Sequence, residues 1–236
     1  MEAIILAGGL GTRLQGVIGA KPKCMAPIAG TPFLHYLLTY LELQQVKRVV
    51  LALGYLHQEV KQYLENNSYN LNFHFVIESK ALGTGGAIVN ALKHCTSPNV
   101  IICNGDTLFL TSLNSFYKKH FEANTICTIA LKPMKHFERY GTVHFDERQQ
   151  VSRFEEKKAQ HEGYINAGLY VINKEQFLLK PFVDSFSFEK DYLEQYYKQE
   201  KIAVYVSDAY FLDIGIPEDY QKAQTEIVQQ FEKLEK

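Results

Sequence analysis

The sequence predicts an α/β fold built on a doubly wound sheet, with helices packed on both of its faces. Two observations support this prediction. Continuous apolar runs of strand length alternate with amphipathic segments of helix length through the first half of the chain. The first run also ends in a glycine-rich turn, at the edge of the sheet where such folds bind their ligands.

The strands and helices of the first half are expected in alternating order. Thr31 and Pro32 are expected to open the first long helix as its N-cap and first residue. Apolar residues recur at helical spacing from Phe33 to Leu41 and support that helix. The other expected elements are strands at residues 3–7, 49–53, 73–77 and 100–103 and helices at residues 57–66 and 85–94.

The second half of the chain is richer in strands. Residues 141–145 and 151–154 flank a polar turn and predict a hairpin. Ser187 is expected to cap a helix that runs to about residue 198. Two further strands are expected, at residues 165–172 and 202–206.

The last helix is expected to begin near Pro217, because Glu218 and Asp219 favour the positive end of a helix. Its apolar stripe consists of Tyr220, Ala223, Ile227, Phe231 and Leu234. We expect this stripe to pack against the core, and a contact in a homo-oligomer is the alternative. We expect one domain over residues 1–236.

Composition and charge exclude several classes of function. The 236 residues are 46% hydrophobic and 22% charged, with a net charge of −1, so neither nucleic acid nor a membrane is an expected partner. No apolar stretch approaches the roughly 18 residues that a membrane span needs. Cys24, Cys95, Cys103 and Cys127 form no paired motif, so free thiols and a cytoplasmic location are expected.

A phosphate-binding loop is expected where the first strand leads into Gly8, Gly9, Gly11 and Arg13. Glycines let several backbone N–H groups point at one anion, and a guanidinium grips phosphate oxygens. Lys23 adds a second cation. The segment lacks the Gly-Lys-Ser/Thr ending of a Walker loop and the third glycine of a dinucleotide fingerprint. An ordinary glycine turn is the alternative, but the two cations favour phosphate binding.

Seven short segments carry a resemblance to a known family. In chain order they are Gly8-Gly9-Leu10-Gly11-Thr12-Arg13-Leu14 with Pro22-Lys23-Cys24-Met25, Leu82-Gly83-Thr84-Gly85-Gly86, Asn104-Gly105-Asp106, Tyr140-Gly141-Thr142-Val143, Phe154-Glu155-Glu156-Lys157, Asn166-Ala167-Gly168-Leu169-Tyr170 and Asp213-Ile214-Gly215-Ile216-Pro217-Glu218-Asp219-Tyr220. Together they resemble the sugar-1-phosphate nucleotidyltransferases over nearly the whole chain, with Cys24 where the family has a second proline. Within that family the chain is most similar to the bacterial D-glycero-α-D-manno-heptose 1-phosphate guanylyltransferases, and next to the mannose-1-phosphate guanylyltransferases.

The resemblance implies a fold and a reaction. The fold is a Rossmann-like, doubly wound mixed sheet of the nucleotide-diphospho-sugar transferase type, with a small β-rich sugar-binding insertion. Residues 1–110 would bind the nucleotide, and residues 111–236 would bind the sugar phosphate. The reaction joins a nucleoside triphosphate to a sugar 1-phosphate and releases pyrophosphate, with Mg²⁺ as cofactor.

Asp106 and Asp213 are the expected Mg²⁺ ligands. Asp106 follows a hydrophobic strand and should lie at the carboxyl edge of the sheet, and Asp213 precedes a glycine that leaves room for a ligand. Mg²⁺ prefers carboxylate and phosphate oxygens. The resemblance assigns both residues this role, and the alternative is two loop aspartates that cap neighbouring turns.

Cations are expected to carry the chemistry, because the sugar phosphate is itself the nucleophile. Arg13 is assigned to the β- and γ-phosphates and the leaving pyrophosphate, and Lys23 to the α-phosphate in the transition state. The resemblance implies that Lys157 holds the phosphate of the sugar. Its alternative is an exposed lysine in a charged run. Leu6, Ala7, Gly8, Gly9, Gly11, Thr12 and Gly83 complete the expected nucleotide site.

Glu78 is expected to select the base. In the family the position five residues before Gly83 lies at the base edge, where thymidylyl and uridylyl members usually have glutamine. A carboxylate only accepts hydrogen bonds, which suits the adjacent N1–H and N2–H₂ donors of guanine. GTP is therefore the expected nucleotide, and a strand-end glutamate facing solvent is the alternative.

The resemblance places Tyr140, Gly141, Glu156 and Asn166 around the sugar. The similarity of the whole chain favours a heptose 1-phosphate over mannose 1-phosphate. Uridylyl transfer to an amino-sugar phosphate is a rival within the enzyme class. A non-catalytic regulator that binds nucleotide or sugar is a rival outside it.

Overall fold

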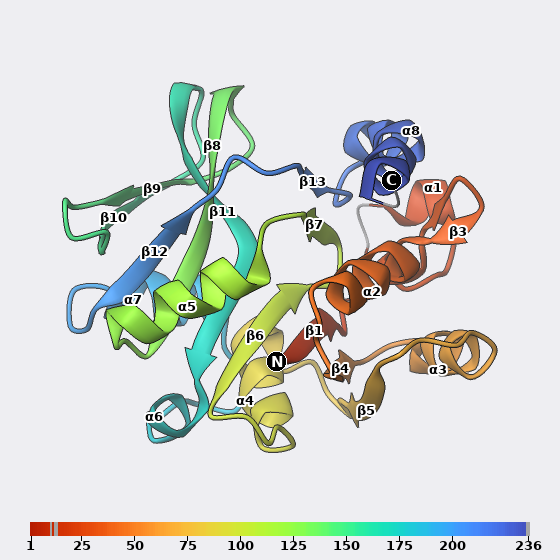
Figure 1. The fold of residues 1–236 in the computed structure, drawn as a ribbon, viewed down its shortest axis with the longest axis horizontal. Helices are drawn as coiled ribbons and strands as arrows, with labels where there is room; N and C mark the ends of the chain where they lie inside the picture. Colours follow the sequence, from red (N-terminus) through yellow and green to blue (C-terminus); the bar gives the residue numbers. More distant parts are fainter. Residues whose placement is uncertain (10, 12–13, 235–236) are drawn as a thin grey trace.

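The computed structural model describes residues 1–9, 11 and 14–234. Its largest sheet has the strand order β10-β9-β11-β6-β1-β4-β5, and β8 joins it by pairing with β11 and β12 (Figure 1). The strands of this sheet are β1 (Glu2–Ala7), β4 (Arg48–Leu53), β5 (Asn72–Ile77), β6 (Asn99–Asn104), β8 (Cys127–Phe137), β9 (Thr142–Phe145), β10 (Val151–Glu155), β11 (Gln160–Asn173) and β12 (Ile202–Val206).

Helices and short pairs of strands connect the sheet. The short pairs are β2 (Pro27–Ile28) with β3 (Thr31–Pro32) and β7 (Thr107–Phe109) with β13 (Phe211–Asp213). The helices are α1 (Gln15–Ile18), α2 (Phe33–Leu43), α3 (His57–Glu65), α4 (Gly83–Leu92), α5 (Leu113–Ala123), α6 (Lys174–Leu178), α7 (Glu194–Tyr196) and α8 (Pro217–Leu234). A 3₁₀ turn, η1 (Lys23–Met25), and a π-helical segment, η2 (Phe188–Leu193), complete the described elements.

Alternate residues of β1 pack on opposite faces of the sheet. Ala3 and Ile5 belong to a core cluster with the apolar residues of α2 and α8. Ile4 belongs to a second cluster with Ile88 of α4 and Phe188 of η2. Because successive side chains of a strand point to opposite faces, helices cover the sheet on both sides. The doubly wound α/β prediction is confirmed.

The carboxyl ends of β1 and β6 bring the glycine loop beside Asp106. These strands are parallel, with Leu6 opposite Asn104. The Gly105 amide donates to the Leu6 carbonyl at 3.0 Å, and a Cβ on Gly105 would stand 2.6 Å from that oxygen. Only glycine allows this approach, so it sets the position of Asp106.

The second half of the chain extends the same sheet. β11 runs antiparallel to both β6 and β8, and it therefore joins the two halves. The hairpin of β9 and β10 lies at the end of the sheet opposite β5 (Figure 1). No helix in the described part of the chain combines the length and the hydropathy needed to cross a membrane.

The structure corrects the expected start of α2. Thr31 and Pro32 form β3 rather than the N-cap and first residue, and α2 begins at Phe33. Pro32 has φ −58° and ψ 141°, an extended conformation that proline adopts readily. Thr31 precedes a proline and is likewise biased toward extended backbone. The Phe33 amide then donates to the Ala26 carbonyl at 2.9 Å.

Other predictions differ from the structure in detail. α4 spans Gly83–Leu92, two residues earlier than expected. Ser187 does cap its helix, but the first turns are π-helical and the helix ends at Tyr196. The stripe of α8 packs into the core except for Leu234, which is 48% exposed near the end of the helix. The four cysteines are free thiols, as expected, and all are buried.

Candidate active site

Two cavities meet at Asn104 and Asp106. We call them the glycine-loop cavity, of about 540 Å³, and the β11 cavity, of about 530 Å³. Both volumes lie in the range of small-molecule sites. Asn104 and Asp106 line both cavities, so ligands in the two would face each other across these residues.

The glycine-loop cavity collects the residues expected to bind a nucleotide. Leu6, Ala7, Gly8, Gly9, Gly11, Lys23, Glu78 and Gly83 all line it. Thr12 and Arg13 lie outside the described residues. Gly11 has φ +63°, the left-handed conformation expected for a loop that turns backbone N–H groups toward an anion.

Lys23 and Asp106 form an ion pair at the junction of the cavities. The Lys23 ammonium lies 2.5 Å from Asp106 Oδ2, and the two side chains are 18% and 25% exposed. The Thr107 hydroxyl donates to Asp106 Oδ1 at 3.3 Å. Lys23 begins the short turn η1, and its side chain packs over Gly11, where a Cβ would lie 3.4 Å from Lys23 Cγ.

Asp213 lies beside Asp106 because β13 pairs with β7. Asp213 is the register partner of Thr107, and the Ile214 amide donates to the Asp106 carbonyl at 3.0 Å. The Gly215 amide donates to Asp213 Oδ1 at 2.6 Å. Burial and the nearby Asp106 carboxylate raise the pKa of Asp213.

The two carboxylates suit a hard divalent cation. Such a cation would relieve the repulsion between Asp106 and Asp213, and Mg²⁺ usually takes only one or two protein carboxylates. The described residues contain no group of three or more His, Cys, Asp or Glu side chains placed to hold a metal. The remaining ligands would therefore come from phosphate and water.

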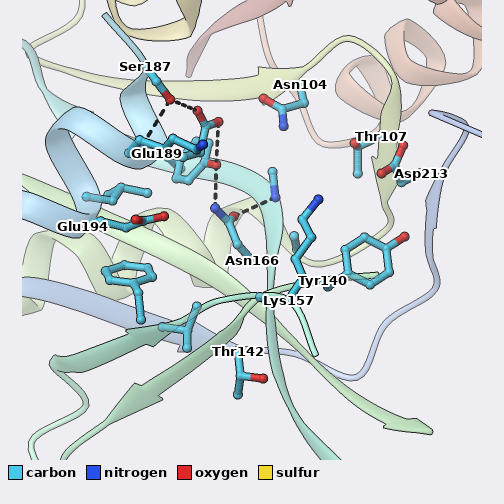
Figure 2. A pocket seen from close by; sticks show the side chains of 18 of the residues that line it. Asn104, Thr107, Tyr140, Thr142, Lys157, Asn166, Ser187, Glu189, Glu194 and Asp213 are labelled. Atoms are coloured by element: carbon cyan, nitrogen blue, oxygen red, sulfur yellow. Dashed lines mark hydrogen bonds between the residues drawn. The ribbon is translucent and has the colours of Figure 1, made fainter. Parts of the chain in front are cut away.

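The β11 cavity collects the residues expected around the sugar phosphate. Tyr140, Gly141, Glu156, Lys157, Asn166 and Asp213 all line it. In Figure 2 the Lys157 side chain projects between Asn166 and Tyr140, and Glu194 lies on the side away from Asp213. Lys157 is exposed and forms no ion pair within the described part of the chain. Its charge is therefore available to an anion.

The Asn166 side chain has a defined orientation. Its Nδ2 donates to the Tyr170 hydroxyl at 2.8 Å, and its Oδ1 accepts from the Gly168 amide at 2.9 Å. One N–H of the amide and one lone pair of Oδ1 remain for a ligand. The side chain therefore keeps one donor and one acceptor, the pair of groups that can bond to a hydroxyl.

Glu78 and Cys24 complete the walls of the glycine-loop cavity. Glu78 Oε2 accepts from the Leu82 amide at 3.4 Å, and burial raises the pKa of this carboxyl group. Burial also raises the pKa of the Cys24 thiol to about 12, so it stays protonated at neutral pH. Cys24 therefore contributes shape to the cavity rather than a nucleophile.

Sequence reasoning missed Arg139, which holds Tyr140. Arg139 Nη2 donates to the Tyr140 hydroxyl at 2.9 Å, and Arg139 Nη1 lies 2.5 Å from Asp219 of α8. Burial raises the pKa of Tyr140 to about 12, and the negative charge of Asp213 acts in the same direction. The one signal for Arg139 in the sequence was that it stands directly before Tyr140.

Several other residues that line the cavities were not predicted as site residues. Among them are Asn104, Thr84 and Glu189. Asn104 and Thr84 stand in segments that resemble the family, so the sequence offered a signal for both. Glu189 stands in none of those segments, and only its place in the fold brings it to the cavity.

Comparisons with known proteins show the family to which the chain belongs. The family model for nucleotidyl transferases matches residues 2–230. A D-glycero-α-D-manno-heptose 1-phosphate guanylyltransferase of Aneurinibacillus thermoaerophilus is 48% identical over 96% of this chain and 98% of its own. A guanylyltransferase with the same activity in its name, from Campylobacter jejuni, is 43% identical over 93% of this chain and 97% of its own. The crystal structure of HddC from Yersinia pseudotuberculosis complexed with GMP-PN superposes with a TM-score of 0.86 at 38% identity, covering 98% of this chain and 99% of that one.

Proposed function

Because the chain belongs to the nucleotidyl transferase family, we propose that it transfers the guanylyl group of GTP to D-glycero-α-D-manno-heptose 1-phosphate. The products are GDP-D-glycero-α-D-manno-heptose and pyrophosphate. The observation that carries this proposal is the meeting of two cavities at Asp106, one beside a glycine loop and the other lined by polar groups suited to a sugar. The names of the relatives support the choice of base and sugar.

The reaction needs alignment of two anions rather than a protein nucleophile. A phosphate oxygen of the sugar 1-phosphate attacks the α-phosphorus of GTP, a new P–O bond forms, and the bond to the β-phosphate oxygen breaks in line. GTP would occupy the glycine-loop cavity and the sugar phosphate the β11 cavity. The junction at Asp106 would then hold the reacting groups.

The cations divide the negative charge between them. Lys23 points into the junction, so its ammonium would exchange Asp106 for the α-phosphate oxygens as charge grows there. Lys157 would hold the phosphate of the sugar from the opposite cavity. Arg13 would hold the β- and γ-phosphates and stabilise the leaving pyrophosphate.

Asp106 and Asp213 would hold Mg²⁺. When bound, Mg²⁺ supplies positive charge to the phosphates and so reduces the repulsion between the two substrates. The support is the nearness of the two carboxylates and the raised pKa of Asp213, which burial and the negative charge of Asp106 cause together.

Glu78 would recognise guanine. Its carboxylate lies in the wall of the glycine-loop cavity and keeps free acceptor capacity after its bond to the Leu82 amide. Guanine offers two adjacent donors, whereas uracil and thymine would place O4 against the same carboxylate.

The test is a panel of nucleotides and sugar phosphates scored by pyrophosphate release. GTP, UTP and dTTP are each paired with D-glycero-α-D-manno-heptose 1-phosphate, mannose 1-phosphate and an amino-sugar 1-phosphate. The proposal expects the highest kcat/KM for GTP with the heptose phosphate. A preference for mannose 1-phosphate or for UTP would assign the chain to a sister activity, and no pyrophosphate from any pair would support a non-catalytic binder.

A further inference from the structure

Three hydroxyl groups donate to one carboxylate, that of Glu189 on η2. Glu189 Oε2 accepts from the Thr84 hydroxyl at 2.7 Å and from the Ser187 hydroxyl at 3.2 Å. Glu189 Oε1 accepts from the Tyr170 hydroxyl at 3.5 Å. Figure 2 shows the bond between Ser187 and Glu189, close to Asn166 among the residues that line the β11 cavity.

Each of these hydroxyls also accepts a bond from an N–H group. The Phe188 amide donates to Thr84 at 2.8 Å, and the Lys190 amide donates to Ser187 at 3.2 Å. Asn166 Nδ2 donates to Tyr170 at 2.8 Å. Since a hydroxyl has one proton, all three protons are committed to Glu189 and none is left for a ligand.

This arrangement decides which way the Asn166 amide faces. The Tyr170 hydroxyl gives its proton to Glu189, so it can only accept from Asn166, and the amide nitrogen must face it. The amide oxygen then faces the Gly168 N–H. Tyr170 is fully buried, so no water competes for its hydroxyl.

Glu189 also joins the two cavities. Thr84 lies in the first turn of α4 and lines the glycine-loop cavity, whereas Asn166 lines the β11 cavity. We propose that Glu189 is a positioning residue that orients Asn166 toward the hydroxyls of the sugar and fixes the start of α4 beside the nucleotide. Glu189 acts through Tyr170 and Thr84 rather than on the reacting phosphates, and this inference rests on the function proposed above.

The substitution Glu189→Gln reverses one of these bonds without changing the size of the side chain. Oε2 accepts two hydroxyls, so the amide oxygen of glutamine should stay there and the NH₂ group should face Tyr170. Tyr170 would then accept from glutamine and donate toward Asn166, and the Asn166 amide would turn its NH₂ group against the Gly168 N–H. The KM for the sugar 1-phosphate should rise about tenfold, the size of one lost hydrogen bond, while the KM for GTP changes less than threefold.

A double-mutant cycle with Tyr170→Phe separates positioning from a general structural role. Phenylalanine keeps the ring packing against Phe188, whose centroid lies 4.8 Å away, but it removes the hydroxyl. If Glu189 acts through that hydroxyl, Glu189→Gln should add no further rise in the sugar KM in the Tyr170→Phe background. Independent, multiplicative effects of the two substitutions would overturn the proposal.

Asp191→Asn is the matched control. Asp191 stands on the same π-helical segment, is exposed, and accepts from the Ser187 amide at 2.7 Å without reaching Tyr170 or Thr84. Its sugar KM should equal that of the wild type. A wild-type sugar KM in Glu189→Gln would overturn the inference and leave the proposed function intact. A wild-type protein that releases no pyrophosphate would instead remove the proposed function.

Discussion

The Lys23 ammonium lies 2.5 Å from the Asp106 carboxylate, although 83 positions separate the two residues in the chain. The pair stands where the two cavities meet, and each of the two residues is also expected to bind a ligand. Lys23 faces phosphate oxygens in the proposed complex, and Asp106 faces Asp213 and a divalent cation. The ion pair therefore keeps both charges compensated until the substrates arrive.

Lys23→Ala is expected to lower kcat roughly 10²- to 10³-fold, because it removes a charge that stabilises the transition state. The measurement is pyrophosphate release at saturating GTP and sugar 1-phosphate, with the urea midpoint as a check on folding. Lys21→Ala is the matched control, since Lys21 is exposed and lines neither cavity. A wild-type kcat in Lys23→Ala would exclude Lys23 from the chemistry.

Asp213→Asn should lose activity without losing stability. Burial and Asp106 raise the pKa of Asp213, so its charged form is unfavourable in the folded protein at neutral pH. Asparagine keeps an acceptor for the Gly215 amide and removes the repulsion. We expect an equal or higher free energy of unfolding in the absence of divalent ions and a steep rise in the Mg²⁺ concentration needed for turnover. Asp208→Asn, at an 86% exposed surface position, is the control. A clear loss of stability in Asp213→Asn would contradict the account.

Glu78→Gln is expected to raise the KM for GTP and to narrow the preference for GTP over UTP. The reason is that glutamine places an N–H donor where guanine also donates.

Burial raises the pKa of Glu78, so protonation should weaken GTP binding at a higher pH than for an exposed glutamate. The wild-type KM for GTP should therefore rise as pH falls, and this rise should be smaller in Glu78→Gln. Glu65→Gln, at an exposed position ending α3, is the control. Identical pH profiles for wild type and Glu78→Gln would count against the assignment.

His120 is expected to make stability depend on pH. The residue is 2% exposed, and burial lowers the pKa of its imidazole from 6.5 to about 4. Above pH 6.5 both the folded and unfolded forms are neutral. As pH falls from about 6.5 to 4, the unfolded chain takes up the proton first, and stability falls by about 3 kcal/mol.

Urea unfolding between pH 4 and pH 7 measures this effect. His120→Gln should lose less stability over that range than the wild type, whatever its stability at pH 7. Exposed His161, replaced in His161→Gln, is the matched control. Parallel stability curves for His120→Gln and the wild type would disprove the role of His120.

Local signals in the sequence were enough for much of the fold. Apolar runs of strand length located β1, β4 and β6, because a parallel strand buried on both faces needs a continuous run. β5 was also located, although it is an edge strand in which Val76 is the buried residue. The hairpin of β9 and β10 was found from its polar turn. Where two local signals competed, the prediction was wrong: Thr31 and Pro32 satisfy a helix start in sequence but pair as a strand.

By itself the sequence determined the fold class and the glycine loop and indicated many of the residues that line the two cavities, because periodicity, turn chemistry and short motifs are properties of neighbouring positions. Only the tertiary structure decided that Lys23 pairs with Asp106, that Arg139 holds Tyr140 against α8, and that Glu189 gathers hydroxyls from two cavities. Glu189 and Thr84 are 105 positions apart. Contacts across such distances depend on how the sheet brings its strand ends and helices together, and no local pattern of residues records that arrangement.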